Sequence, residues 1–204
     1  MKVKICGLHP TRDVQLCIDL GVNFLGFVFY TKSPRNVNLK EIKKLKYYNK
    51  QNSKFVAVTV NPSNEFIKST IIENFDYIQL HGNETKERVK EIKLMGLKII
   101  KTIKIRDEID IDEYKKYEKA DIILFDTPGM EKSIKFPKDL ISKLPKGERY
   151  AVAGSISQKN IENIKKLGVN FCDLSSNLET DDKIGYKDHH KIIKFINKVN
   201  EIKN

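Results

Sequence analysis

Apolar residues along this chain follow two alternating patterns, one typical of buried strands and the other of amphipathic helices. Short apolar runs are separated by stretches in which apolar residues recur every three or four positions. The runs predict eight strands, at residues 2–7, 24–29, 55–60, 77–81, 98–104, 121–127, 150–154 and 171–176. The intervening stretches predict eight helices, at residues 11–20, 39–48, 64–73, 86–95, 108–118, 137–144, 158–167 and 189–199.

Eight strand–helix units in 204 residues predict an α/β fold, specifically a (β/α)8 TIM barrel at the short end of its size range. No long linker interrupts the units, so residues 1–204 are expected to form a single domain. A doubly wound open sheet is the competing fold. It normally has fewer strands and a Gly-rich first turn, and residues 7–10 (GLHP) do not provide such a turn.

The formal net charge of +11 raises the question of a nucleic-acid partner. The lysines argue against one, because they are spread along every predicted helix instead of gathering with aromatic residues on one face. Solvated helix faces are the preferred interpretation, with a general attraction for anionic substrates. We therefore expect a small-molecule partner and no nucleic acid.

The three cysteines, Cys6, Cys17 and Cys172, are too few and too scattered for a disulfide framework or a metal site. By position in their elements, Cys17 and Cys172 are expected in the core. No apolar run approaches the roughly 20 residues that cross a bilayer, and Met1 is followed almost at once by a strand pattern instead of a signal peptide. The sequence therefore predicts a cytoplasmic protein with no membrane partner.

Polar residues gather where the predicted strands end, and in such a barrel this end carries the active site. Cys6 ends the first strand and Asp126 the sixth, so a thiol and a carboxyl group should face one ligand as base and acid. This arrangement indicates proton transfer on a small phosphorylated sugar. The other polar residues at strand ends are Arg35 after the second strand, His81 at the fourth, Gly154 and Ser155 at the seventh, and Ser176 and Asn177 at the eighth.

Five sequence pieces fall in a specific order along the chain: KICG, GFVF with SPR, QLHG, DTPG and DLSS. Together they resemble the phosphoribosylanthranilate isomerase family over essentially the whole chain. The resemblance implies an Amadori rearrangement of N-(5-phosphoribosyl)anthranilate to 1-(2-carboxyphenylamino)-1-deoxyribulose 5-phosphate in tryptophan biosynthesis. It also implies that neither a cofactor nor a metal is needed.

The resemblance assigns roles to the residues at the strand ends. Cys6 matches the family's general base, whose thiolate a nearby cation would favour, although a small buried apolar residue is the alternative. Asp126 matches the general acid; it should cap an apolar interior column that raises its pKa, and the alternative is a loop cap with residues 127–128. Arg35 would contact the anthranilate carboxylate, or else be a solvated loop residue. His81 would position the ligand, or else make a structural hydrogen bond.

The phosphate is expected on backbone N–H groups of the turns at Gly154, Ser155, Ser176 and Asn177. The family usually has glycine at the positions of Ser155 and Asn177, where positive φ would cost a non-glycine residue free energy. The family's Gly-Gly-Thr-Gly loop after the sixth strand is also replaced, by GMEKSI at residues 129–134. That replacement is the only support for a non-catalytic, ligand-binding relative.

Strand alternation also places Lys4 on the same face as Cys6, inside the barrel. Because a buried ammonium needs an anionic partner, we predict an ion pair with Asp173 on the eighth strand, favouring the Cys6 thiolate. The alternative is that Lys4 lies between the strands and the helices and reaches solvent. Another phosphosugar isomerase or epimerase barrel remains an alternative, although the histidine-pathway isomerases typically work with two aspartates. The oligomeric state is open, and a monomer is favoured.

Overall fold

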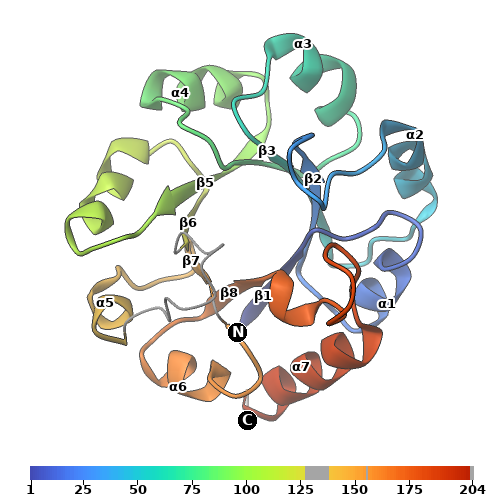
Figure 1. Ribbon diagram of the computed structural model, residues 1–204. Coiled ribbons are helices and arrows are strands. Elements are labelled where there is room, and N and C mark those ends of the chain that lie inside the picture. Colours follow the sequence, from blue (N-terminus) through green and yellow to red (C-terminus); the bar gives the residue numbers. More distant parts are fainter. Residues whose placement is uncertain (127–137, 155, 203–204) are drawn as a thin grey trace.

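Eight parallel strands close into a barrel in the computed structural model, which describes residues 1–126, 138–154 and 156–202 (Figure 1). Each strand pairs with the next, and β8 pairs with β1 to close the ring. This confirms the predicted (β/α)8 barrel and excludes the open sheet. The strands are β1 Lys2–Cys6, β2 Phe24–Phe29, β3 Lys54–Thr59, β4 Tyr77–Leu80, β5 Lys98–Lys104, β6 Ile122–Asp126, β7 Tyr150–Ala153 and β8 Phe171–Leu174.

Helices surround the strands as an outer ring (Figure 1). Several predicted α-helices are shorter than expected or contain tighter and wider turns. In η3, Ile and Asp occupy four of the first five positions, and both are weaker helix formers than Ala, Leu or Glu. The described α-helices are α1 Val14–Asp19, α2 Leu39–Ile42, α3 Asn64–Phe66, α4 Lys86–Leu94, α5 Lys138–Lys143, α6 Ile161–Lys166 and α7 His189–Glu201. The other helical turns are η1 Lys43–Tyr47, the π-helix η2 Ile67–Ile71, η3 Ile109–Tyr117 and η4 Ser176–Leu178.

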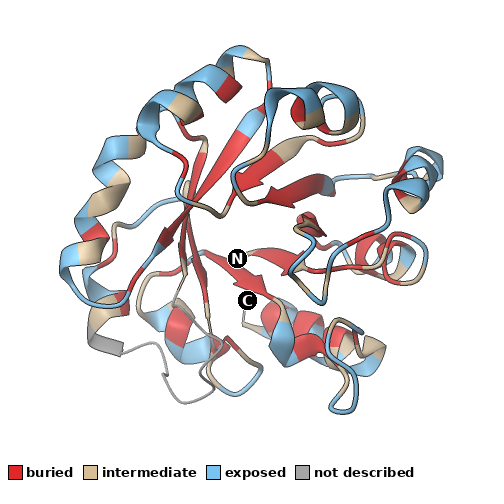
Figure 2. Cartoon of the chain, turned by 45° about the horizontal axis from the view of Figure 1, so that its top comes forward, coloured by how far each residue is buried: buried red, intermediate tan, exposed pale blue. Residues whose placement is uncertain are grey.

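Apolar side chains form two separate cores on the two faces of the barrel wall. The larger core lies between the strands and the helices and includes Cys17 and Cys172, both fully buried as predicted. The smaller core fills the barrel interior from alternate strand positions such as Val56, Val58 and Leu124. Figure 2 shows the strands buried along most of their length, while the helices turn exposed faces outward. Along each strand, side chains therefore alternate between the barrel interior and the layer between strands and helices.

The barrel interior changes from apolar to polar along the strands. Near its lower end Phe24 stacks on Phe171 at 4.9 Å between ring centroids and meets Tyr77 edge-on at 5.4 Å. Two residues further along β1 and β8 the interior holds the buried polar side chains Lys4 and Asp173. These aromatic rings therefore pack together at the amino ends of the strands, below the buried polar side chains.

A second buried ion pair fixes the loops beside β3 and β4. Lys101 Nζ lies 2.9 Å from Glu84 Oε2, and both side chains are almost fully buried. The other oxygen, Glu84 Oε1, accepts hydrogen bonds from the backbone N–H groups of Asn61 and Gly82. Lys101 also donates to the carbonyl oxygen of Gly82. The pair therefore holds the loop that follows β4 and carries His81.

We expect Lys101→Met to lower the free energy of unfolding by about 3–5 kcal/mol, because it leaves the Glu84 carboxylate buried without its cation. Urea denaturation followed by circular dichroism measures the change. Lys115→Met is the matched control, because the Lys115–Asp112 pair is well exposed and its loss should change stability little. Equal stability of the two variants would contradict the importance of the buried pair.

Candidate active site

An ion pair inside the barrel, called the floor pair, joins the two strands that close it. Lys4 on β1 and Asp173 on β8 are direct partners in the strand register. Lys4 Nζ lies 2.8 Å from Asp173 Oδ2, and the two side chains are 1% and 6% exposed. The predicted ion pair is therefore confirmed. Asp173 Oδ1 has no hydrogen-bond partner among the described residues, so the floor keeps one unused acceptor.

Gly26 on β2 makes room for the ammonium group beside the thiol. A Cβ atom at position 26 would lie 3.1 Å from Lys4 Nζ and 3.3 Å from Cys6 Sγ. Both groups therefore border the space that a side chain would fill. The missing side chain lets Lys4 reach the carboxyl end of β1 from two residues below Cys6.

The thiol of Cys6 does not have the low pKa that nearby cations were expected to give it. Burial raises the pKa of Cys6 above its ordinary value, and the Asp173 carboxylate raises it further. The positive charges of Lys4 and Lys187 act in the opposite direction but do not overcome burial. The direction predicted for Lys4 is thus right, whereas the expectation of a thiolate favoured over its ordinary value is wrong.

Asp126 ends β6, and its side chain is 23% exposed. Burial raises the pKa of this carboxyl to about 7, and the neighbouring Asp173 raises it as well. Lys4 and Lys104 lower it to a smaller extent. The direction of the shift agrees with the sequence prediction, and it keeps a protonated form of the carboxyl accessible near neutral pH. The alternative loop cap at residues 127–128 lies outside the described residues.

His81 follows β4 and faces the carboxyl group of Asp126. Its Nε2 atom lies 3.6 Å from Asp126 Oδ2, just beyond hydrogen-bonding distance. Gln79 Nε2 lies 3.2 Å from His81 Nδ1. Burial and the charge of Lys4 lower the pKa of His81 to about 4, so the ring is neutral at pH 7. A neutral imidazole ring therefore faces the acid.

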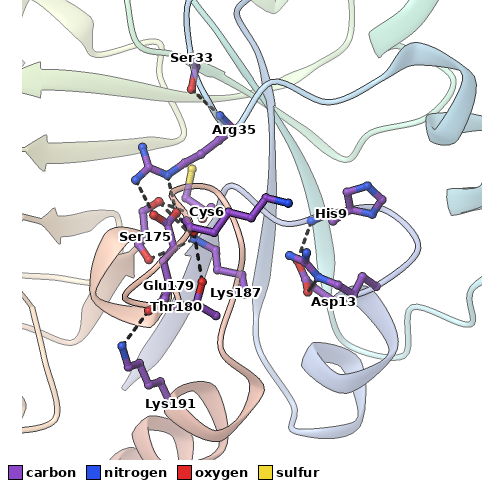
Figure 3. A network of polar contacts seen from close by, with 12 residues as sticks. Cys6, His9, Asp13, Ser33, Arg35, Ser175, Glu179, Thr180, Lys187 and Lys191 are labelled. Carbon is purple, nitrogen blue, oxygen red and sulfur yellow. Dashed lines mark hydrogen bonds and ion pairs between the residues drawn. The ribbon is translucent and has the colours of Figure 1, made fainter.

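Arg35, in the loop after β2, is bound by the carboxylate of Glu179, which follows β8. Its Nε and Nη2 atoms donate to Glu179 at 2.5 and 2.8 Å. Lys187 Nζ lies 3.0 Å from the same carboxylate. Figure 3 shows Arg35 reaching across to Glu179, close to the Cys6 thiol. Arg35 is 20% exposed, so it is not the freely solvated loop residue of the alternative interpretation.

The turns after β7 and β8 lie next to each other at the mouth. Gly154 has a φ of +90°, and Asn177 Nδ2 donates to the carbonyl oxygen of Ile156 at 2.7 Å. Ser176 and Asn177 open the 3-10 turn η4, where the first backbone N–H groups lack carbonyl partners within the helix. Asn177 does not adopt a positive φ, so the absence of glycine there causes no backbone strain.

Two predicted parts of the site cannot be placed in this way. Ser155 and the replaced loop at residues 129–134 lie outside the described residues. The proposed contribution of Ser155 to phosphate binding remains a prediction, as does any effect of the replaced loop on turnover.

Comparison with known proteins agrees with this arrangement. The family model described as N-(5'phosphoribosyl)anthranilate (PRA) isomerase matches residues 3–198. The N-(5'-phosphoribosyl)anthranilate isomerase of Aquifex aeolicus is 36% identical over 206 aligned positions, covering 96% of this chain and 97% of that protein. The chain belongs to the phosphoribosylanthranilate isomerase family.

Two solved structures of family members show the same fold. The Thermotoga maritima enzyme superposes with a TM-score of 0.86 at 25% identity, covering 98% of this chain and 99% of the other. A phosphoribosyl anthranilate isomerase in complex with reduced 1-(o-carboxyphenylamino)-1-deoxyribulose 5-phosphate gives a TM-score of 0.83 at 25% identity, with the same coverage. The ligand of the second protein resembles the product expected from the sequence.

Sequence reasoning missed the two charged residues that hold Arg35. Glu179 lies two residues beyond Asn177, the last of the predicted site residues, and Lys187 lies in the following loop. Their polar positions after a strand end were a usable signal, but nothing in the sequence indicated their partner. Among the described residues no cluster of His, Cys, Asp and Glu side chains could hold a metal ion. In the same part of the chain, no helix has the length and apolar character needed to span a bilayer.

We expect Lys4→Met to raise the pKa of the Cys6 thiol, because it removes the largest interaction that lowers it. The pH dependence of alkylation at Cys6, followed by peptide mass spectrometry, measures this pKa. The deeply buried Cys17, with a pKa raised to about 12, is an internal reference. The double variant Lys4→Met/Asp173→Asn should show a smaller rise, because it also removes the carboxylate. A Cys6 pKa that stays constant in Lys4→Met would rule out the coupling.

Proposed function

We propose that this protein is an aldose–ketose isomerase that converts N-(5-phosphoribosyl)anthranilate to 1-(2-carboxyphenylamino)-1-deoxyribulose 5-phosphate in tryptophan biosynthesis. The observation that carries the proposal is the pairing of Cys6 and Asp126 at the carboxyl ends of β1 and β6, above one buried ion pair. Membership of the family and the ligand named for the related structure support it.

Asp126 acts as the general acid in this proposal. Its pKa of about 7 leaves a protonated fraction that can transfer a proton to the ribose ring oxygen. Ring opening then produces a cationic iminium group and leaves a carboxylate behind. The N–H group of His81, 3.6 Å away, is placed to stabilise that carboxylate and to orient the ligand.

Cys6 acts as the general base and removes the proton from C2 of the open-chain iminium. The iminium makes this C–H group more acidic, and its positive charge favours the thiolate against the opposing effect of burial. The resulting enamine tautomerises to the ketose product. One proton thus moves from Asp126 to the ring oxygen and another from C2 to Cys6, and both side chains return to their starting states by proton exchange with solvent. The steps require no cofactor.

Binding residues surround these two groups. Arg35 contacts the anthranilate carboxylate through its planar guanidinium group. Backbone N–H groups at Gly154, Ser155, Ser176 and Asn177 bind the phosphate. The net positive charge of the chain assists the approach of a substrate that carries both anionic groups.

The loss of anthranilate-ribosyl fluorescence on incubation with the purified protein tests the proposed function. We expect Asp126→Asn to fold normally and to lose about 10²–10⁴-fold in kcat, because the amide has no transferable proton. Cys6→Ser should lose a similar amount, because a hydroxyl group is a poor base. Wild-type rates in either variant would remove the assigned acid or base, and an inactive wild-type protein would remove the function.

The pH dependence of kcat/KM provides a separate prediction. The active form has Asp126 protonated and Cys6 ionised, and it is a minority because the pKa of the thiol lies above that of the carboxyl. Its population rises as the pH increases through about 7, levels off, and falls above the pKa of the thiol. We therefore expect half-maximal kcat/KM near pH 7 on the acidic side. A flat profile between pH 5 and pH 8 would contradict the assignment.

The proposed setting of the enzyme is the cytoplasm, where its three unpaired cysteines would stay reduced. A single domain spanning residues 1–204 and a monomeric state are part of the same proposal. Light scattering coupled to size-exclusion chromatography measures the oligomeric state directly.

A further inference from the structure

One edge of the Arg35 guanidinium group is bound by protein, and the other edge is free. The carboxylate of Glu179 accepts hydrogen bonds from Nε and Nη2, the two donors on one side of the guanidinium group. Among the residues that the structure describes, Nη1 donates no hydrogen bond. Because the guanidinium group is planar and has five donors, Nη1 and the second N–H of Nη2 form another fork for a carboxylate.

Glu179 is itself held in place, so it can hold Arg35. Its side chain is 5% exposed, and Lys187 Nζ, which is fully buried, lies 3.0 Å from it. Lys187 also donates to the carbonyl oxygen of Ser175 at 3.1 Å. Although burial alone would raise the pKa of Glu179, hydrogen bonds from Arg35 and the charge of Lys187 hold it at about 2. The three charges leave one net positive charge facing the pocket.

Glycines fix the path of the Arg35 segment. A Cβ atom at Gly7, directly after Cys6, would lie 2.6 Å from Arg35 Cδ, and one at Gly185 would lie 2.8 Å from the carbonyl oxygen of Pro34. Both glycines have positive φ, +75° and +85°. Arg35 is therefore packed between the loops that follow β1 and β8. This packing restricts the orientations that its guanidinium group can adopt.

We propose that Glu179 is a positioning residue that selects for a carboxylate-bearing substrate by presenting the free Nη1/Nη2 edge of Arg35 to it. Lys187 keeps Glu179 in place. This inference rests on the proposed function and adds to it the origin of specificity for the anthranilate carboxylate.

Glu179 could in principle compete with the substrate for Arg35 instead of positioning it. The two roles predict opposite changes in KM when the charge of Glu179 is removed. If Glu179 competes with the substrate for Arg35, removing its charge frees the guanidinium group and lowers KM. If Glu179 positions Arg35, removing its charge lets the guanidinium group rotate and raises KM. The ratio between a carboxylate substrate and its carboxyl-free analogue separates either effect from general damage to the loop.

The experiment compares N-(5-phosphoribosyl)anthranilate with N-(5-phosphoribosyl)aniline, using wild-type protein, Glu179→Gln and Arg35→Lys. We expect both variants to raise KM for the anthranilate substrate about tenfold, equivalent to about 1.4 kcal/mol, with a smaller change in kcat. KM for the aniline substrate should stay near the wild-type value. Asp181→Asn is the matched control in the same loop, because Asp181 is 96% exposed and pairs only with Lys191 among the described residues. It should change neither KM.

Three results would overturn the inference. A lower KM for the anthranilate substrate in Glu179→Gln would make Glu179 a competitor. An equal rise in KM for both substrates would make it a structural residue, and an unchanged KM in Arg35→Lys would remove the carboxylate contact itself. In each case an active wild-type protein leaves the proposed function intact. A wild-type protein inactive on the anthranilate substrate would refute the function and this inference together.

Discussion

The buried ion pair between Lys4 and Asp173 connects the closure of the barrel to its chemistry. It lies at the seam between β1 and β8, and neither charge could stay buried without the other. Each end of the pair acts more strongly on a different neighbour. The Lys4 charge outweighs that of Asp173 at Cys6, whereas the Asp173 charge outweighs that of Lys4 at Asp126. The charges of the pair together therefore lower the pKa of Cys6 and raise that of Asp126, while burial raises both.

A second group of charges, near the mouth, has a different purpose. Arg35, Glu179 and Lys187 join the loop after β2 to the chain that follows β8. The floor pair of Lys4 and Asp173 changes the pKa values of Cys6 and Asp126, whereas this second group fixes the position of the Arg35 guanidinium. The two meet at Cys6, whose thiol is influenced by Lys4 and by Lys187. Catalysis and recognition therefore share an electrostatic environment in this pocket, although different loops supply the residues.

The sequence predicted what depends on strand alternation and missed what depends on loops. Period-two patterns placed Lys4 inside the barrel and Asp126 at its rim, and the closure of eight strands brought Lys4 next to Asp173. Arg35 and Glu179 are 144 residues apart in irregular segments, where no period relates them. The direction in which the pKa of Cys6 shifts could not be predicted from the sequence either. Strand parity identifies the neighbouring charges, but not the depth of burial whose effect outweighs theirs.

Gly26 contributes to the pocket through volume that the chain leaves empty. A methyl group there would stand 3.1 Å from the ammonium nitrogen and 3.3 Å from the sulfur, so even alanine would force one of them to move. Transplanting this thiol and lysine onto another barrel would therefore fail wherever the second strand carries any side chain at that height. A designer would have to delete an atom from the neighbouring strand before adding a functional group to the first.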